Sequence, residues 1–332
     1  MPTTSRGARK QSGTGSLIFR NTRQLHITIV GGGRLGAALG RALHRLGRQI
    51  DLVITRHIST AKRAAKTIDS RTLPATFGQL QNQDSAGFRR FSESDVIIIA
   101  TPDAAIESVA RQIAALFGER VFASIRKRQT VLHTSGAISS QILSPLSLIG
   151  FATGSFHPLV SVAHAKSDPT IFRGVYFCVE GNARAARMAR MLVTQMGGQS
   201  FTIKSESKPL YHAAAVMTAG HIVALFDLAV LMLRNCGLSA RDAQLILLPL
   251  LRSTETNLEK NNPARALTGP YARGDFETAL KHLAALEKSG LKDADEVYKV
   301  LARHSLELGK TLKRDPNFEQ LIHLLNRSLN NN

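Results

Sequence analysis

The chain has 332 residues, enough for two ordinary domains, each with its own core. Its 43% hydrophobic and 20% charged residues are typical of a globular protein and exclude a chain that is disordered as a whole. The formal net charge of +19 favours an anionic ligand such as a phosphorylated cofactor, and it also raises nucleic acid as a partner. Aromatic residues make up only 5% and are not interleaved with basic ones, so nucleic acid is the weaker expectation.

Residues 1–24 lack acidic side chains and are rich in Ser, Thr, Gly and Arg, a composition typical of disorder. They contain no long apolar run and so do not form a secretory signal. An organelle transit peptide and a bacterial extension both remain open. The cysteines, Cys178 and Cys236, fit neither a disulfide framework nor a metal-ligand spacing. We therefore expect reduced thiols in a cytoplasmic protein, and no metal site.

The first predicted strand ends in a glycine motif. The β-branched run 27–30 leads into Gly31-x-Gly33-x-x-Gly36, and leucines at helical spacing follow. A dinucleotide pyrophosphate needs this order, because Gly31 permits the turn, Gly33 lets the backbone approach phosphate, and Gly36 lets the helix pack closely on the strand. The alternative is a glycine-rich connection in another α/β protein. The expected cofactor contacts in this loop are Gly31, Gly33, Arg34, Leu35 and Gly36.

Strand-like and helix-like patterns alternate up to about residue 203, which predicts an α/β fold with a Rossmann-like, doubly wound parallel sheet. The stretch 71–91 is expected to be a loop. Further strands are predicted over 50–54, 94–100, 130–133, 174–180 and 200–203.

The pattern changes beyond Lys204, where only helices are predicted and an all-α C-terminal domain is expected. These helices cover 207–234, 239–258, 276–288, 291–312 and 315–328. The expected parts of the chain are a disordered basic extension over 1–24, a Rossmann-like NAD(P)-binding domain over 25–204 and the α-helical domain over 205–328.

One predicted helix, 213–233, is long enough to cross a bilayer. It carries His221 and Asp227 near its middle, and an aspartate there costs about 2.5–3.5 kcal/mol. We therefore predict a core or interface helix rather than a membrane span. It favours a homodimer formed through the helical domain, and His221 is expected to be a buried structural or interface residue.

The end of the second predicted strand favours NADP(H) over NAD(H). An NAD-binding unit carries an acidic residue there, about 20 residues past the glycines, for the ribose 2′-hydroxyl. In this chain Thr55 and Arg56 occupy that position, and Asp51 lies at the other end of the strand. Arg56 can grip a 2′-phosphate bidentately, Thr55 can add a hydroxyl, and Arg34 is a second candidate. The alternative is that Arg56 is a solvated surface residue.

The chain resembles the superfamily of 6-phosphogluconate, β-hydroxyacid and prephenate dehydrogenases. It more closely resembles an uncharacterised bacterial oxidoreductase family with a Rossmann-like NAD(P)-binding domain and a C-terminal helical domain of unknown function. The resemblance implies the two-domain fold and hydride transfer at the carboxyl edge of the sheet, but no named substrate. Beyond the glycine loop it rests on the segments 100–103, 133–137, 154–158, 208–215 and 267–275.

The resemblance also supplies catalytic candidates. β-Hydroxyacid dehydrogenases carry Lys-x-x-x-Asn at the corresponding juncture, and here Lys208 and His212 stand four residues apart. By analogy Lys208 is the candidate general acid, provided that burial or positive neighbours lower its pKa. His212 departs from the pattern and would orient substrate or share the proton transfer. The alternative is an exposed lysine and a structural histidine.

The remaining candidates follow the ends of predicted strands. Ala100, Thr101 and Pro102 end a strand where the nicotinamide ribose is expected to pass. Ser135 and Gly136 follow the next strand, where a hydroxyl and backbone N–H groups would bind a carboxylate or carbonyl oxygen. His157 resembles the histidine of the His-Pro pair that follows a strand in prephenate dehydrogenases, and would contact substrate or shape a turn.

Three functions are open. An NADP-dependent oxidoreductase would transfer a hydride between nicotinamide and a small, carboxylated carbonyl, imine or alcohol. A non-catalytic NADP(H)-binding sensor would use the same cofactor site without turnover, and the departure at His212 keeps this possibility open. A nucleic-acid binder ranks last, because a phosphate-binding domain already accounts for a basic site.

Overall fold

The computed structural model describes residues 24–117, 129–312, 319–323 and 325–326. They form two compact units that divide between Ala215 and Val216. The boundary expected near Lys204 stays a prediction; the division seen here assigns the first part of helix α9 to the first unit. Except for Gln24, the basic extension lies outside the described residues, as does half of the helix expected over 315–328.

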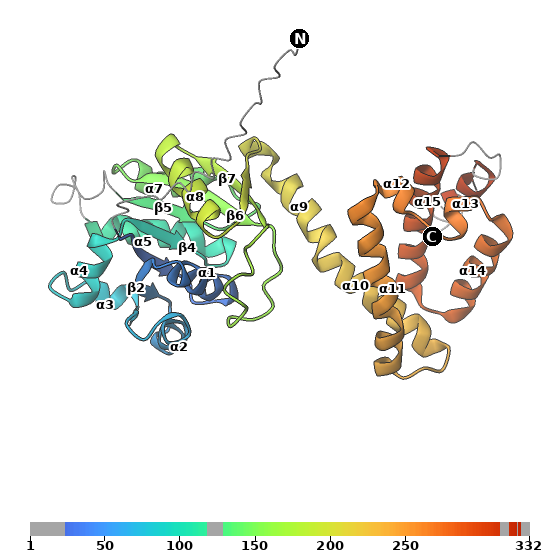
Figure 1. Cartoon of the computed structure of the whole chain (residues 1–332), viewed down its shortest axis with the longest axis horizontal. Helices are drawn as coiled ribbons and strands as arrows, with labels where there is room; N and C mark the ends of the chain where they lie inside the picture. Colours follow the sequence, from blue (N-terminus) through green and yellow to red (C-terminus); the bar gives the residue numbers. More distant parts are fainter. Residues whose placement is uncertain (1–23, 118–128, 313–318, 324, 327–332) are drawn as a thin grey trace, which may run out of the picture. The chain divides into compact units, whose positions relative to one another are not determined.

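The first unit is built on an eight-stranded sheet in the order β3-β2-β1-β4-β5-β6-β7-β8. Figure 1 labels β2, β4, β5, β6 and β7 of this sheet. The strand order reverses between β1 and β4, which is the switch point where open α/β sheets bind ligands. The Rossmann-like α/β fold is thus confirmed. The strands are β1 His26–Val30, β2 Gln49–Ile54, β3 Leu73–Ala75, β4 Val96–Ile99, β5 Thr130–His133, β6 Ala152–Pro158, β7 Tyr176–Gly181 and β8 Gln199–Phe201.

The alternating pattern predicts a sheet that is parallel throughout, and the structure differs from this prediction at one edge. Strand β7 runs antiparallel to β6, and β8 runs parallel to β7. The connection from β6 to β7, residues 159–175, holds no helix that could carry the chain back to the starting edge of the sheet, so β7 returns in the opposite direction. His157 and Pro158 belong to β6 itself and do not follow the strand.

Both faces of the sheet are buried, which accounts for the unbroken apolar runs in its strands. In β4, Val96 and Ile98 enter one core with helices α1 and α8, whereas Ile97 and Ile99 enter the other with α4 and α5. Successive side chains of a strand point to opposite faces, so a four-residue run serves both cores. The helices of this part are α1 Arg34–Arg45, α2 Ile58–Ile68, α3 Phe77–Leu80, α4 Ala86–Glu93, α5 Ile106–Phe117, α7 Ser144–Ser147, α8 Ala183–Gln195 and α9 Lys208–Thr218, with short 3₁₀ turns η1 Asp103–Ala105, η2 Ser140–Leu143 and η3 Ser205–Ser207.

The expectation of a loop over 71–91 is wrong, because strand β3 and helices α3 and α4 lie there. Local capping explains the helices. Thr76 and Gln79 form a capping box for α3, and the Ser85 hydroxyl accepts the Phe88 N–H at the start of α4. Elements this short have too few turns to show an apolar period.

The second unit is helical, as predicted. The expected single helix over 207–234 is two helices, α9 and α10, separated at Ala219. The segment around 269–275 contains the short helix α13 between Gly269 and Gly274, which have positive φ angles of 89° and 70°. The helices of this unit are α10 Gly220–Asn235, α11 Ala240–Lys260, α12 Pro263–Ala266, α13 Pro270–Arg273, α14 Phe276–Ser289 and α15 Lys292–Lys310.

Apolar side chains of α10 and α11 are exposed in the single chain. The stretch Ser205–Asn235 is long and apolar enough to span a membrane, yet only 6% of its most apolar window is buried. Val223 and Leu250 are 69% and 63% exposed. His221 is also exposed, so of the two roles expected for it, that of a core histidine is wrong.

Candidate functional site

Two adjoining pockets lie along the carboxyl edge of the sheet, both within the first unit. The first, about 620 Å³, is lined by the glycine loop, the end of β2 and the segment after β4. The second, about 410 Å³, is lined by the start of α1, the loop after β5, the end of β6 and His212. The two share the lining residues Gly33, Ala100, Thr101 and Pro102. A ligand could therefore extend from one pocket into the other.

The glycine loop has the geometry of an anion cradle. Gly31 has a φ of +112°, and a Cβ on it would collide with the Ala100 carbonyl group. A Cβ at Gly36 would collide with the Gly31 carbonyl oxygen, so this glycine lets α1 start close to β1. A Cβ at Gly33 would meet nothing within 4 Å. Gly31 and Gly36 thus serve the fold, and Gly33 faces open space where a ligand would approach.

The start of α1 is open to an anion. Gly33 occupies the N-cap position, no side chain caps it, and the first turn carries no acidic residue. Free N–H groups at a helix N-terminus attract phosphate. The Thr101 hydroxyl lies buried at the junction of the pockets, without a hydrogen-bond partner among the described residues. The open Gly33, the uncapped helix and this unpaired hydroxyl fit a dinucleotide.

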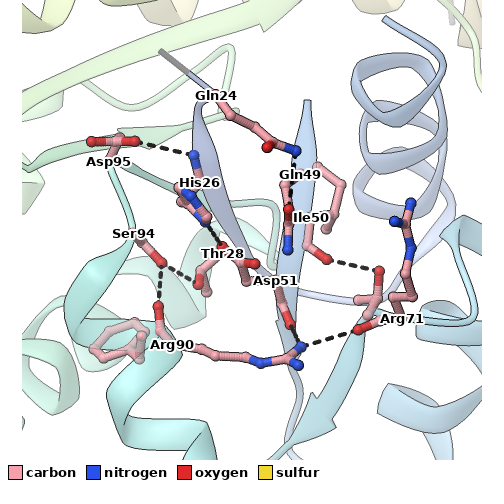
Figure 2. Close-up of polar contacts among 12 residues, drawn as sticks. Gln24, His26, Thr28, Gln49, Ile50, Asp51, Arg71, Arg90, Ser94 and Asp95 are labelled. Carbon is pink, nitrogen blue, oxygen red and sulfur yellow. Dashed lines mark hydrogen bonds and ion pairs between the residues drawn. The ribbon is translucent and has the colours of Figure 1, made fainter. Parts of the chain in front are cut away.

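Asp51 is excluded as a ribose ligand, because it belongs to a polar network at the opposite, amino end of the strands (Figure 2). Its carboxylate accepts a 2.7 Å hydrogen bond from His26 Nδ1, and the Arg90 guanidinium donates to its backbone oxygen. Arg90 also donates to the Arg71 carbonyl. With 4% of its surface exposed, Asp51 stabilises the sheet edge.

Thr55 and Arg56 both line the first pocket. The Thr55 hydroxyl donates to the His57 carbonyl at 2.7 Å, within the turn that starts α2. Arg56 has no ion-pair partner among the described residues. Arg34 lines the second pocket and not the first. Of the two arginines proposed for a 2′-phosphate, only Arg56 is therefore placed beside the end of β2.

Two histidines converge in the second pocket, over Gly136. The rings of His157, from β6, and His212, from α9, lie 5.4 Å apart and nearly perpendicular. A Cβ on Gly136 would stand 2.5 Å from His212 Nδ1 and 2.8 Å from His157 Cε1. The glycine is thus required for both rings to approach the loop. His212 Nδ1 is buried without a partner among the described residues.

Tyr211 orients His157. Its hydroxyl lies 2.7 Å from His157 Nδ1, and burial raises the pKa of Tyr211, so the phenol keeps its proton. Burial, together with the nearby His212 and Lys208, lowers the pKa of His157 to about 4. His157 is therefore neutral at pH 7. When Tyr211 donates to Nδ1, the His157 proton resides on Nε2.

Ser135 has its hydroxyl engaged within its own loop. The hydroxyl donates to Asp103 at 2.8 Å and accepts the N–H groups of Ala137 and Ile138. These bonds connect the loop after β5 to the turn after β4. In this arrangement Ser135 shapes the pocket, and Asp103 adds a carboxylate to its lining.

Lys208, expected at the reaction centre, is fully buried and does not line either pocket. Its Nζ donates to Ser155 Oγ at 2.8 Å and to the Ser135 carbonyl at 3.2 Å, and it pairs with Glu180 at 3.3 Å. Burial lowers the pKa of Lys208, and the Glu180 carboxylate opposes this change. Its catalytic role stays a prediction.

Glu180 balances the buried lysine. Burial tends to raise its pKa, but hydrogen bonds from Ser205 and the Ser140 N–H, with the charge of Lys208, lower it overall. Ser205 donates at 2.6 Å and the Ser140 N–H at 2.7 Å. A carboxylate with these donors stays ionised.

Sequence reasoning missed Glu180, Asp103 and Tyr211. Glu180 carried a usable signal, because it is the single charge in the strand-like run 175–180. Asp103 and Tyr211 lie beside residues already singled out, at 102 and 212. Their contacts join segments far apart in the chain, and no sequence spacing reports those contacts.

Comparison with known proteins agrees with this architecture. A Rossmann-like domain model matches residues 11–158, and a model described as a domain of unknown function (DUF2520) matches residues 175–305. The sheet and the glycine loop thus define a Rossmann-like protein. More narrowly, the chain joins a Rossmann-like domain to a DUF2520 domain, in agreement with the resemblance seen in its motifs. No curated protein matches the chain.

Solved structures share the fold. A protein from Thermotoga maritima is 22% identical over 87% of this chain and 100% of its own, with a TM-score of 0.65. A protein from Bacteroides fragilis named as an inferred NADP oxidoreductase is 22% identical over 86% and 98%, with a TM-score of 0.66. A reductive aminase from Aspergillus terreus, in complex with NADPH and ethyl-5-oxohexanoate, is 16% identical over 93% and 95%, with a TM-score of 0.54. At these identities the similarity shows the fold alone.

Proposed function

We propose that this protein is an NADP-dependent oxidoreductase acting on a small, carboxylated carbonyl, imine or alcohol. The observation that carries the proposal is the pair of adjoining pockets, one with an open helix N-terminus beside Arg56 and the other with two converging histidines. The similarity to structures named as NADP-dependent enzymes supports the choice of cofactor class. When bound, NADP(H) would supply or accept the hydride.

The residues of the first pocket would hold the cofactor. Gly33 would admit the pyrophosphate to the start of α1, which attracts negative charge, while Gly31 and Gly36 would shape the loop. Arg56 would pair with a 2′-phosphate, which a carboxylate at this position would repel. Ala100, Thr101 and Pro102 would line the passage into the second pocket.

The residues of the second pocket would bind substrate and move the proton. Of the two catalytic candidates, only His212 lines the pocket, and its imidazole would carry the exchanged proton. Neutral His157 would donate a hydrogen bond from Nε2 to the reacting oxygen or nitrogen and keep its proton, with Tyr211 fixing its ring. Arg34, exposed at the start of α1, would pair with the substrate carboxylate.

A binding and turnover series tests this function. The purified protein is titrated with NADPH and NADH, and loss of NADPH absorbance is then followed with 2-oxo acids and cyclic imino acids. We expect NADPH to bind at least about tenfold more tightly than NADH, and turnover to fall about 10²-fold or more in His212→Gln. Binding without turnover on any substrate would favour the sensor, and failure to bind NADPH would contradict both functions.

We also propose that two copies of the chain associate through exposed apolar side chains of α10 and α11 in a cytoplasmic homodimer. Large exposed apolar patches on soluble proteins mark interfaces, and a second copy offers the same surface. The break at Ala219 and the presence of His221 and Asp227 argue against a membrane span. Both cysteines, buried Cys178 and exposed Cys236, are free thiols, which suits a reducing compartment.

A further inference from the structure

Helix α9 begins with a buried charge. Lys208 is its first residue, and the side chain is fully buried. The ammonium contacts Ser155 of β6, Glu180 of β7 and the carbonyl of Ser135 in the loop after β5. One group therefore ties the start of α9 to two strands and a loop at the edge of the sheet.

The same helix carries groups of the second pocket. Tyr211 and His212 stand three and four residues after Lys208, about one turn along the helix, so they share its side. A helix is rigid over one turn, so a change at its first residue is transmitted to His212. Gly136, over which His212 lies, directly follows Ser135. Lys208 thus holds both the helix that carries His212 and the loop beneath it.

We propose that Lys208 is a positioning residue and not the proton donor. It sets the distance between α9 and the loop at 135–136, so that His212 stands over Gly136 beside His157. An ammonium has three hydrogens, and three acceptors surround this one, which leaves none for a substrate. The kinetic consequences rest on the proposed function, whereas the geometric ones do not.

Two variants separate the roles. Lys208→Met leaves the Glu180 carboxylate buried without its cation, whereas the double variant Lys208→Met/Glu180→Gln removes both charges with little change of volume. Removing one partner of a buried pair is strongly disruptive, and replacing both is often tolerated. We expect Lys208→Met to lower kcat about 10²-fold through misplacement of His212, and the double variant to recover to within about tenfold of wild type.

A proton donor would give another pattern. The double variant would then stay as inactive as Lys208→Met, because neither contains an ammonium, and this result would overturn the proposal. Lys204→Met is the matched control, since Lys204 is exposed shortly before α9, and it should behave as wild type. NADPH affinity, measured for every variant, should change less than about threefold where the fold is intact, because Lys208 does not line the first pocket.

A second readout needs no turnover. In histidine-labelled protein at pH 8, the NMR ring signals of His157 and His212 should move in Lys208→Met and return towards wild type in the double variant. Unmoved signals in Lys208→Met would overturn the positioning role. If the wild type turns over no substrate, the proposed function fails, while this measurement still decides whether Lys208 positions the histidines.

Discussion

Gly33 and Gly36 belong to the same motif but face different surroundings. Alanine at Gly36 would collide with the Gly31 carbonyl oxygen, whereas alanine at Gly33 meets open space. We expect Gly36→Ala to lower the free energy of unfolding by about 2 kcal/mol or more. Gly33→Ala should change the free energy of unfolding by less than about 1 kcal/mol, and it should lower the affinity for NADPH at least about tenfold. Urea unfolding and NADPH titration measure the two effects, and equal destabilisation by both would contradict this division.

Arg56 is the residue on which the cofactor preference depends. Arg56→Glu should lower the affinity for NADPH by roughly 10- to 100-fold, since a charge-assisted hydrogen bond contributes about 1.5–3 kcal/mol. The affinity for NADH should fall far less. Lys62→Glu, an equal change of charge on the exposed side of α2, is the control and should leave the ratio of the two affinities unchanged. An unaltered ratio in Arg56→Glu would identify Arg56 as a solvated surface residue.

His157 makes folding sensitive to acid. Its pKa falls from an ordinary 6.5 to about 4 on folding, so between these values the unfolded chain binds the proton that the folded chain excludes. The free energy of unfolding is therefore highest above pH 6.5 and decreases towards pH 4, and His157 accounts for up to about 3 kcal/mol of this decrease. In His157→Gln this part of the decrease should vanish in urea unfolding at pH 7 and pH 4.5. An undiminished pH dependence would contradict the assignment.

Among the elements, strands β1, β2 and β4 have different roles at their two ends. The carboxyl ends of β1, β2 and β4 form pockets, whereas their amino ends are joined by the network of His26, Asp51, Ser94 and Arg90 (Figure 2). Parallel strands place all their carboxyl ends together, so this division follows from the topology. Changes at the amino ends should alter stability and not binding.

Asp51→Asn tests that separation. It replaces the buried carboxylate that His26 contacts in the amino-terminal half of β2. We expect the free energy of unfolding to fall by about 1–3 kcal/mol. NADPH affinity should be unchanged, because the first pocket lies at the other end of β2. Weakened NADPH binding in a fully folded variant would contradict the separate roles of the two strand ends.

At the scale of the whole molecule, the exposed apolar side chains of α10 and α11 point to self-association. We expect light scattering to give twice the chain mass of 36.1 kDa. Val223→Glu combined with Leu250→Glu should yield monomers, because a buried unpaired carboxylate is costly at an interface. Leu148→Glu, at a still more exposed leucine of the first unit, should leave the dimer intact. A wild-type monomer would contradict the proposed assembly.

Much of this protein could be predicted from its sequence, because the signals involved are local. A strand, a glycine turn and a helix stand next to one another at 26–45, and apolar periodicity separates the α/β part from the helical part. The short elements β3, α3 and α4 and the antiparallel turn of β7 were not predictable in this way. The short elements contain too few residues to show a periodic pattern. The direction of β7 depends on the strand with which it pairs, which the local sequence does not report.

In the candidate site, too, some features follow from local sequence and others depend on contacts between distant segments. The glycine cradle, the basic end of β2 and the histidine four residues after Lys208 could all be predicted from adjacent residues. The burial of Lys208 against Glu180, the meeting of His157 and His212 over Gly136, and the placement of Arg34 and Arg56 in different pockets became visible only in the folded chain. Burial and pairing depend on contacts between segments distant along the chain, whereas turns and helix starts depend on neighbouring residues.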